Sequence, residues 1–182
     1  MTHRNRNSRF RNTFTPRGLG AIAATAALCA FALSPSAAPS RALLVWNATA
    51  SAPIGLYRVG HSRVLARGDL VLAVPAAPLG AFADARGYLP HGVPLVKRIA
   101  AVAGDTVCAR GNAILINGRI AAQRLAADGE GRPLAAWEGC RKLRSGEVFL
   151  LMADVRSSFD GRYFGLTPTS QIAGTLKPIW TR

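Results

Sequence analysis

The chain has 182 residues, of which 23 are Lys or Arg and 9 are Asp or Glu, giving a formal net charge of +14. Apolar residues make up 49% of the sequence and charged residues only 18%, which excludes an intrinsically disordered polyelectrolyte. The length predicts one folded domain with an additional segment and excludes two large domains.

The amino terminus has the charge pattern of a membrane-entry segment. Residues 1–17 contain five arginines and no acidic residue, and residues 18–33 contain no charged residue. Because arginine-rich flanks stay in the cytoplasm, the pattern predicts a basic cytoplasmic terminus over 1–17, a membrane anchor or signal segment over 18–38, and an exported domain over 39–182. The apolar stretch is shorter than the roughly 20 residues of a membrane span, and Ser36-Ala37-Ala38 offers a cleavage site, so retention and removal both stay open. The main body is therefore expected outside the cytoplasm.

Beyond residue 17 the basic residues are scattered singly along the chain. No recognition helix, zinc-ligand spacing or aromatic stacking motif accompanies them, so nucleic acid is not expected as a partner. Basic side chains on an exported domain can instead contact anionic lipid headgroups. The inner membrane is therefore an expected partner.

The remainder of the chain predicts a mainly β fold, because short apolar runs are interrupted by Gly and Pro and no long stretch has helical periodicity. The predicted strands are Leu43–Trp46, Gly55–Val59, Asp69–Val74, Leu95–Val102, Thr106–Ala109, Ala113–Ile116, Arg119–Ala122, Glu147–Met152 and Gly174–Ile179.

Three further segments have local signals. Asn117-Gly118 lies between apolar runs and predicts a two-residue hairpin turn. A helical turn is expected near Leu79–Ala85, in a stretch rich in Ala, Gly and Pro. Residues 123–146, with several glycines, are expected to form an irregular insertion.

Cys108 and Cys140 form the plausible disulfide pair of an exported domain, because the third cysteine lies inside the apolar segment. The sequence alone does not show whether the two thiols are close enough to form a disulfide. The sequence has no Cys-x-x-Cys pair, and its three histidines lie far apart, so neither a metal site nor a cofactor is expected.

Lys97 is the lysine that lies inside an apolar run. On a strand it shares a face with Leu95 and Ile99, while Arg98 points the other way. Burial would lower the pKa of the amine and produce a neutral general base. The alternative is a lysine at a strand end whose amine reaches water.

Two polar segments could supply the partners of such a base. Ser51 lies two residues before Pro53 and before Gly55, so its hydroxyl is expected on a bent loop, although an ordinary turn serine has the same pattern. The preceding Asn47-Ala48-Thr49 matches a glycosylation sequon, a short pattern with many false matches.

Ser158, Asp160 and Arg162 are predicted to lie on one side of an extended segment, where the carboxylate and guanidinium can pair. The alternative interpretation is an ordinary salt bridge in a loop.

Four ordered segments together resemble the type I signal peptidase family, serine proteases with a Ser/Lys dyad. The matching segments are Ser51–Tyr57, Arg67–Val71, Lys97–Asp105 and Ser158–Gly165. The Ser-x-Pro-x-Gly-x-Tyr spacing is similar to the TraF-type branch of conjugative-transfer peptidases, whereas leader peptidases usually have proline three residues after the serine. Met152-Ala153-Asp154 also replaces the Gly-Asp-Asn that commonly opens the last segment.

The resemblance implies a role for each matching residue. Ser51 would be the nucleophile and Lys97 the general base. The backbone N–H of Ser51 and the Thr49 hydroxyl would hold the oxyanion. Asp160 would be an essential supporting residue that pairs with Arg162 and, with Ser158, sets the surroundings of the lysine.

The resemblance further implies a signal-peptidase-like β-rich catalytic domain with one N-terminal membrane helix. The expected location is the bacterial inner membrane, with the catalytic domain in the periplasm. Its substrate would be a membrane-tethered pilin precursor, cleaved during mating-pair formation and in some systems closed into a ring. The peptidase is expected to act as a monomer. The alternatives are a general leader peptidase, a non-catalytic β module that binds envelope proteins, and a self-cleaving repressor-like Ser/Lys relative.

Overall fold

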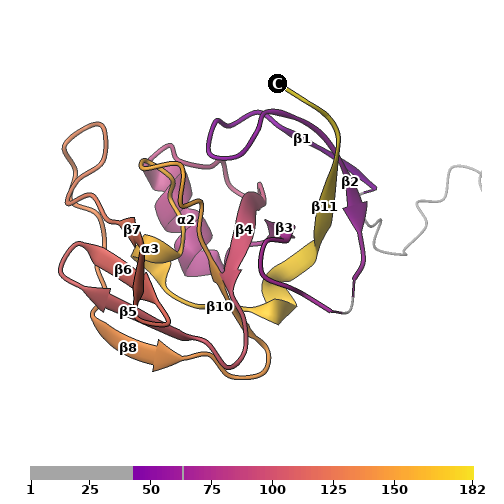
Figure 1. Cartoon of the computed structure of the whole chain (residues 1–182). Helices are drawn as coiled ribbons and strands as arrows, with labels where there is room; N and C mark the ends of the chain where they lie inside the picture. The colour runs from indigo at the N-terminus through magenta and orange to yellow at the C-terminus, as the bar shows by residue number, and fades with distance from the viewer. Residues whose placement is uncertain (1–42, 63) are drawn as a thin grey trace, which may run out of the picture. The chain divides into compact units, whose positions relative to one another are not determined.

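Antiparallel pairing organises the chain into two sheets (Figure 1). The structure, a computed structural model, describes residues 43–62 and 64–182. The seven-stranded sheet has the order β1-β2-β11-β3-β4-β9-β10, and the four-stranded sheet has the order β7-β6-β5-β8. The strands are β1 (Leu44–Asn47), β2 (Gly55–Gly60), β3 (Leu70–Ala73), β4 (Leu95–Ala101), β5 (Thr106–Arg110), β6 (Ala113–Ile116), β7 (Arg119–Gln123), β8 (Gly139–Lys142), β9 (Glu147–Leu150), β10 (Thr167–Pro168) and β11 (Ile172–Thr181).

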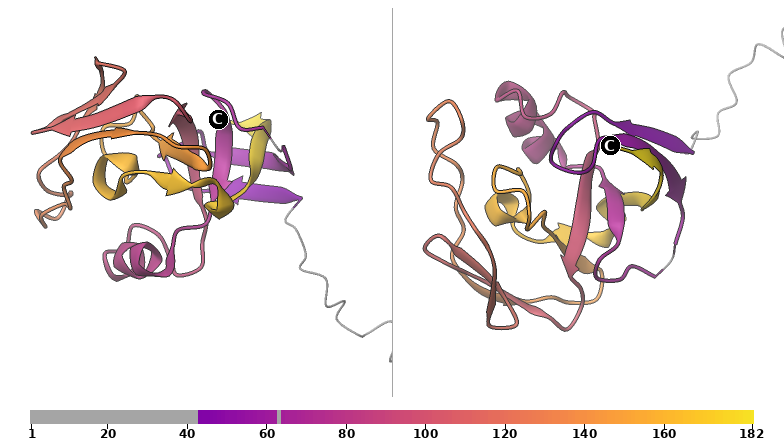
Figure 2. Two further views of the ribbon diagram at one scale, coloured as in Figure 1. Left: turned by 90° about the horizontal axis from the view of Figure 1, so that it is seen from below. Right: turned by 45° about the horizontal axis from the view of Figure 1, so that its top comes forward.

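Short helices connect some of the strands: α2 (Ala77–Ala85), α3 (Gly161–Phe164) and the 3-10 turn η1 (Thr169–Gln171). In the left view of Figure 2, α2 and the four-stranded sheet lie on opposite sides of the segment that carries α3. The described residues form one compact unit. The mainly β fold predicted from the sequence is therefore confirmed.

Strand β4 lies inside the large sheet and is covered on both faces. Leu95 and Ile99 pack in a cluster that includes Ala83 of α2, whereas Val96 packs in a second cluster with residues of β2 and β11. Burial on both faces explains why the strand is apolar almost throughout rather than alternating. Lys97 interrupts this run.

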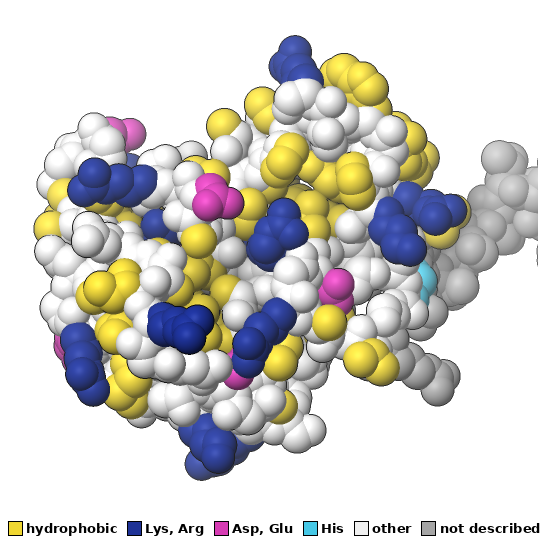
Figure 3. Space-filling view, viewed as in Figure 1, with side chains coloured by type: hydrophobic (Ala, Val, Ile, Leu, Met, Phe, Trp, Pro, Cys, Tyr) yellow, Lys and Arg dark blue, Asp and Glu magenta, His cyan; other side chains and the backbone are white. Residues whose placement is uncertain are grey.

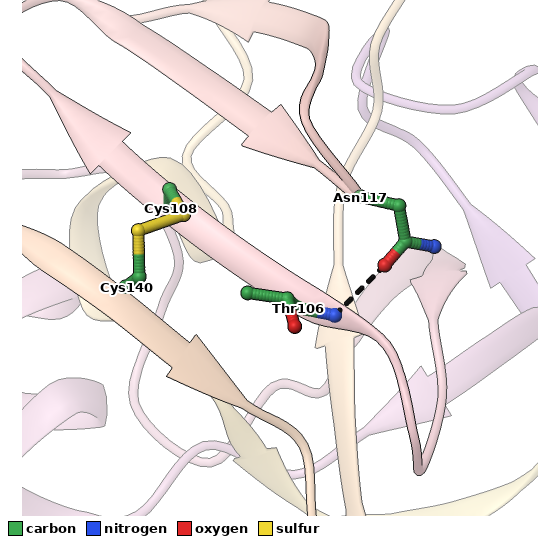
Figure 4. Close-up of a disulfide and its surroundings, with 4 residues drawn as sticks. All are labelled: Thr106, Cys108, Asn117 and Cys140. Carbon is green, nitrogen blue, oxygen red and sulfur yellow. Dashed lines mark hydrogen bonds between the residues drawn. A yellow bond between two sulfur atoms is a disulfide. The ribbon is translucent and has the colours of Figure 1, made fainter.

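The four-stranded sheet contains the predicted hairpin. Asn117 and Gly118 have φ values of 51° and 80°, the left-handed conformations that a tight turn between these strands requires. The Asn117 side chain also accepts a hydrogen bond from the backbone N–H of Thr106 at 2.9 Å (Figure 4). The hairpin prediction is confirmed.

A disulfide joins Cys108 of β5 to Cys140 of β8 (Figure 4). All four residues of β8 are exposed, so its sequence has no apolar alternation. Backbone pairing with β5 and the disulfide hold it in place instead. The prediction that 123–146 is wholly irregular is therefore wrong for this short edge strand.

Other differences concern element boundaries and the last polar segment. Helix α2 begins before the expected Leu79, with a proline in its first turn, and β11 extends beyond the expected strand at both ends. The segment predicted to be extended near Asp160 is instead a turn followed by α3. Asp160 caps the helix by accepting the backbone N–H of Arg162, because a carboxylate satisfies a free N–H of the first turn.

The predictions for residues 1–38 lie outside the described residues. In the part of the chain that the structure describes, no helix is long and apolar enough to cross a membrane.

Reduction of the Cys108–Cys140 disulfide is expected to destabilise the domain. The bridge closes a loop with a sequence separation of 32, and its chain-entropy contribution to the free energy of unfolding is about 3 to 4 kcal/mol. Chemical denaturation of the oxidised protein and of a Cys108→Ser/Cys140→Ser variant measures the difference. Alkylation of the unreduced, denatured protein should label Cys29 alone; labelling of all three cysteines would contradict the bridge.

Candidate active site

The loop that carries Ser51 connects β1 to β2. Tyr57 is 1% exposed, and its hydroxyl donates a 2.6 Å hydrogen bond to the carbonyl of Pro53. This burial raises the pKa of Tyr57. A Cβ at Gly55 would collide with the backbone of Trp180, so only glycine fits there. The Ser-x-Pro-x-Gly-x-Tyr spacing thus has a structural explanation: it bends the loop and fixes it to the sheet.

Lys97 approaches this loop from β4. Its amine Nζ lies 3.0 Å from the Ser51 hydroxyl oxygen and 3.0 Å from the Ser158 hydroxyl oxygen. The lysine is 2% exposed, whereas the next residue, Arg98, is exposed. The predicted inward orientation of Lys97 is therefore confirmed, and the alternative in which its amine reaches water is wrong.

Burial changes the acid–base behaviour of this amine. Loss of solvent lowers the pKa of Lys97 from 10.5 to about 8. The negative charge of Asp160 raises this pKa and the positive charge of Arg162 lowers it, so the two charges oppose each other. A substantial fraction of the amine is therefore neutral at mildly alkaline pH.

Asp160 and Arg162 form a buried ion pair beside the lysine, with exposed fractions of 0% and 1%. The carboxylate accepts bonds of 2.9 Å from both Nε and Nη2 of the guanidinium, and it also accepts the backbone N–H of Met152 at 3.0 Å. The guanidinium additionally donates to the carbonyls of Met152 and Val155, at 2.9 and 2.6 Å. These contacts organise the turn that presents Ser158, and they confirm the predicted pairing.

A cavity of about 300 Å³ lies beside Ser51 and Lys97. Its lining is largely apolar and includes Leu89, Leu95 and Phe159. Peptide side chains of apolar character can therefore be held next to the two polar groups.

Two loops form opposite walls of this cavity and contact each other. Tyr88 lies on the loop that follows α2, and its hydroxyl donates a hydrogen bond to the carboxylate of Asp128 in the insertion 123–146. This bond holds the pKa of Asp128 well below its usual range, and the backbone N–H and side chain of Arg132 add to the effect. Because Tyr88 and Asp128 both line the cavity, this bond joins two of its lining segments.

The structure brings together most of the residues singled out in the sequence. The Thr49 and Ser51 hydroxyl oxygens lie 3.2 Å apart. Sequence reasoning missed the cavity wall at Tyr88 and Asp128, and it considered Asn47 only as part of a sequon. In the structure Asn47 is buried, and its side chain donates a hydrogen bond to the loop of Ser51.

Within residues 43–62 and 64–182, no group of three or more His, Cys, Asp and Glu side chains could hold a metal ion.

Known proteins resemble this chain over most of its length. The plasmid transfer protein TraF of Escherichia coli is 36% identical over 146 residues, covering 74% of this chain and 81% of that protein. The conjugal transfer protein TraF of Agrobacterium fabrum strain C58 is 35% identical over the same length, with the same coverage. The signal peptidase I of Enterococcus faecalis V583 has a solved structure that aligns with a TM-score of 0.38 and 20% identity, covering 63% of this chain and 98% of that one.

The family model described as signal peptidase, peptidase S26, matches residues 17–181, which include all four segments of the sequence motif. That match and the TraF relatives agree with each other. The chain therefore belongs to the peptidase S26 family of signal peptidases and is a serine peptidase.

Proposed function

We propose that this chain is a membrane-anchored endopeptidase that processes a pilin precursor during conjugative transfer, using Ser51 as nucleophile and Lys97 as general base. The observation that carries the proposal is the 3.0 Å separation between Ser51 Oγ and an amine that is buried on β4. A serine hydroxyl is a weak nucleophile until a neighbouring base accepts its proton, and a desolvated lysine is such a base.

The reaction proceeds in two steps. Neutral Lys97 accepts the Ser51 proton as Oγ attacks the peptide carbonyl, and the resulting ammonium then protonates the departing amine. Lys97 then accepts a proton from water, or from a free amino terminus of the substrate, as that group attacks the acyl carbonyl. The lysine returns the proton to Ser51 Oγ as the acyl–oxygen bond breaks, which releases an acid or a closed ring. Ser158 holds the lysine amine in place, and the Asp160–Arg162 pair supports the turn that carries Ser158.

The oxyanion that forms during the attack needs hydrogen-bond donors near Ser51. We assign this role to the backbone N–H of Ser51 and the hydroxyl of Thr49. The second assignment is supported by the position of Thr49, 3.2 Å from Ser51 Oγ. A single donor of this kind typically contributes about 3 kcal/mol to transition-state stabilisation.

The role in conjugation rests on the relatives, whose names are plasmid transfer protein and conjugal transfer protein. These names favour conjugative processing over general secretory processing. A monomer acting on a membrane-tethered precursor is sufficient, because tethering both proteins raises their effective concentration.

The membrane part of the proposal is supported by the outer face of β1, β2 and β11. Trp46 and Trp180 stack there with their ring centroids 5.8 Å apart, and both are about half exposed. Arg58 and Lys177 are paired in register on the same strands and are exposed. Figure 3 shows hydrophobic and basic side chains gathered over this part of the molecule, at the upper right. Aromatic and basic side chains together suit the interface of an anionic bilayer.

Substitution of either member of the dyad is expected to abolish processing. Ser51→Ala and Lys97→Ala should each lower the rate by about 10⁴-fold or more, because nucleophile and base act as one unit. The measurement is cleavage of a pilin precursor by the full chain in vesicles, followed by mass spectrometry of the product. Ser145→Ala and Lys142→Ala, both at exposed positions, are matched controls that should process normally. Processing by either dyad variant would refute the mechanism.

Activity is expected to rise with pH through the pKa of the buried lysine. Only the neutral amine accepts a proton, so kcat/KM should increase about tenfold per pH unit below an apparent pKa of about 8 and level off above it. Initial rates from pH 6 to 10 test this. A flat profile, or activity that falls as the pH rises from 6 to 8, would exclude Lys97 as the titrating base.

The two stacked tryptophans are expected to contact lipid in the full chain. In vesicles of phosphatidylglycerol and brominated phosphatidylcholine, a Trp137→Phe variant, which keeps Trp46 and Trp180, should be quenched at least twofold more than a Trp46→Phe/Trp180→Phe variant. Arg58→Gln/Lys177→Gln should reduce the difference, because the anionic headgroups lose their partners. Equal quenching of the two tryptophan variants would contradict the membrane contact.

A further inference from the structure

Asn47 is a buried polar side chain that the proposed mechanism does not yet use. It is the last residue of β1 and is 5% exposed. Its Nδ2 donates to the carbonyl oxygens of Thr49, Ala52 and Pro53, at 3.0, 3.1 and 3.0 Å. The two amide hydrogens are thus shared among three acceptors on the loop that carries Ser51.

The orientation of the Asn47 carboxamide follows from these contacts. Its Oδ1 accepts the backbone N–H of Thr49 at 3.2 Å and the Thr49 hydroxyl at 3.0 Å. Turning the amide over would place Nδ2 against the Thr49 N–H and Oδ1 against three carbonyl oxygens, so these four contacts would become repulsive and only the contact with the Thr49 hydroxyl could be kept. One orientation is therefore far more stable than the other.

This orientation determines where the Thr49 hydroxyl proton points. Oδ1 of a carboxamide only accepts, so the single proton of the Thr49 hydroxyl is donated to Asn47. Thr49 Oγ1, 3.2 Å from Ser51 Oγ, then presents a lone pair to the serine. In the resting state the serine hydroxyl can donate to Thr49 while it accepts from the charged amine of Lys97.

We propose that Asn47 is a positioning residue for the peptidase reaction, which holds the loop of Ser51 and turns the Thr49 hydroxyl so that its lone pair faces the nucleophile. The inference rests on the proposed role of Ser51. Its consequence is that the Ser51 O–H donates its hydrogen bond to Thr49 Oγ1 until Lys97 becomes neutral, and the lone pair of the amine can then accept that hydrogen bond instead. The Thr49 hydroxyl can donate to an oxyanion only after it breaks its hydrogen bond to Asn47 Oδ1. The strength of that bond therefore also controls when the hydroxyl is available to the oxyanion.

A double-mutant cycle tests whether Asn47 acts through Thr49. The variants are Asn47→Ala, Thr49→Val and the two combined, assayed as full chains in vesicles with the pilin precursor. Asn47→Ala is expected to lower kcat about ten- to a hundredfold and to change KM less than about threefold, because a misplaced reacting group lowers kcat. The double variant should process no more than about threefold more slowly than the slower single variant.

Rescue by a conservative substitution separates the need for the Thr49 hydroxyl from packing at this position, and the double-mutant cycle tests its orientation by Asn47. Thr49→Ser keeps the hydroxyl and should lose much less activity than Thr49→Val, which has a similar shape without it. Asn112→Ala, at an exposed asparagine elsewhere, is the matched control. If Asn47→Ala does not fold, as judged by circular dichroism and thermal unfolding, the Thr49 pair still decides the matter: equal rates for the two variants would overturn the proposal.

Two further outcomes would overturn the inference alone. Wild-type kcat in Asn47→Ala would do so, and so would a double variant whose loss equals the product of the single losses. Full activity of Ser51→Ala would instead refute the proposed function, so the two failures are distinguishable.

Discussion

One buried amine sets the requirements for the rest of the site. Lys97 lies almost without solvent on a strand whose neighbouring residues are apolar, and burial of a charged ammonium without partners is strongly unfavourable. Hydroxyl groups from two distant segments, Ser51 and Ser158, offset this cost at 3.0 Å each. Loss of solvent lowers the pKa of Lys97 to about 8, with opposing contributions from the charges of Asp160 and Arg162, so the amine is not always charged.

The Asp160–Arg162 pair places one negative and one positive charge near this amine. Their effects on the pKa of Lys97 have opposite signs, so the pair does not hold the amine in one protonation state. A buried ion pair is stable only when its remaining donors and acceptors are satisfied. Here backbone groups of Met152 and Val155 satisfy them, and the same bonds shape the turn that carries Ser158. One network therefore supports both the geometry and the electrostatics of the lysine.

The loop that carries Ser51 has further hydrogen bonds besides the contact with Lys97. Tyr57 holds the distal half of its loop through Pro53, and Asn47 holds the proximal half through the backbone and hydroxyl of Thr49. The apolar cavity beside the serine is lined in part by two further loops, which are joined by the hydrogen bond between Tyr88 and Asp128. In this S26-family peptidase, strand β4 thus positions the amine, and loops held by side-chain hydrogen bonds position Ser51 and Ser158.

The sequence by itself determined the β class, the Asn117-Gly118 hairpin and the ordered motif around Ser51, because each depends on local periodicity, turn conformation or spacing. It left open whether the Lys97 amine is buried or reaches water, and the packing around β4 decided this. It could not determine edge strand β8, the capped turn at Asp160 or the cavity wall at Asp128, whose residues are polar and have no local periodicity. Only the tertiary structure decided that the Ser51 hydroxyl, the Lys97 amine and the Ser158 hydroxyl meet, and that the Asn47 amide turns toward Thr49. These contacts join segments whose relative positions depend on sheet order and packing, and the orientation of a single amide depends on which carbonyl oxygens the folded loop presents to it.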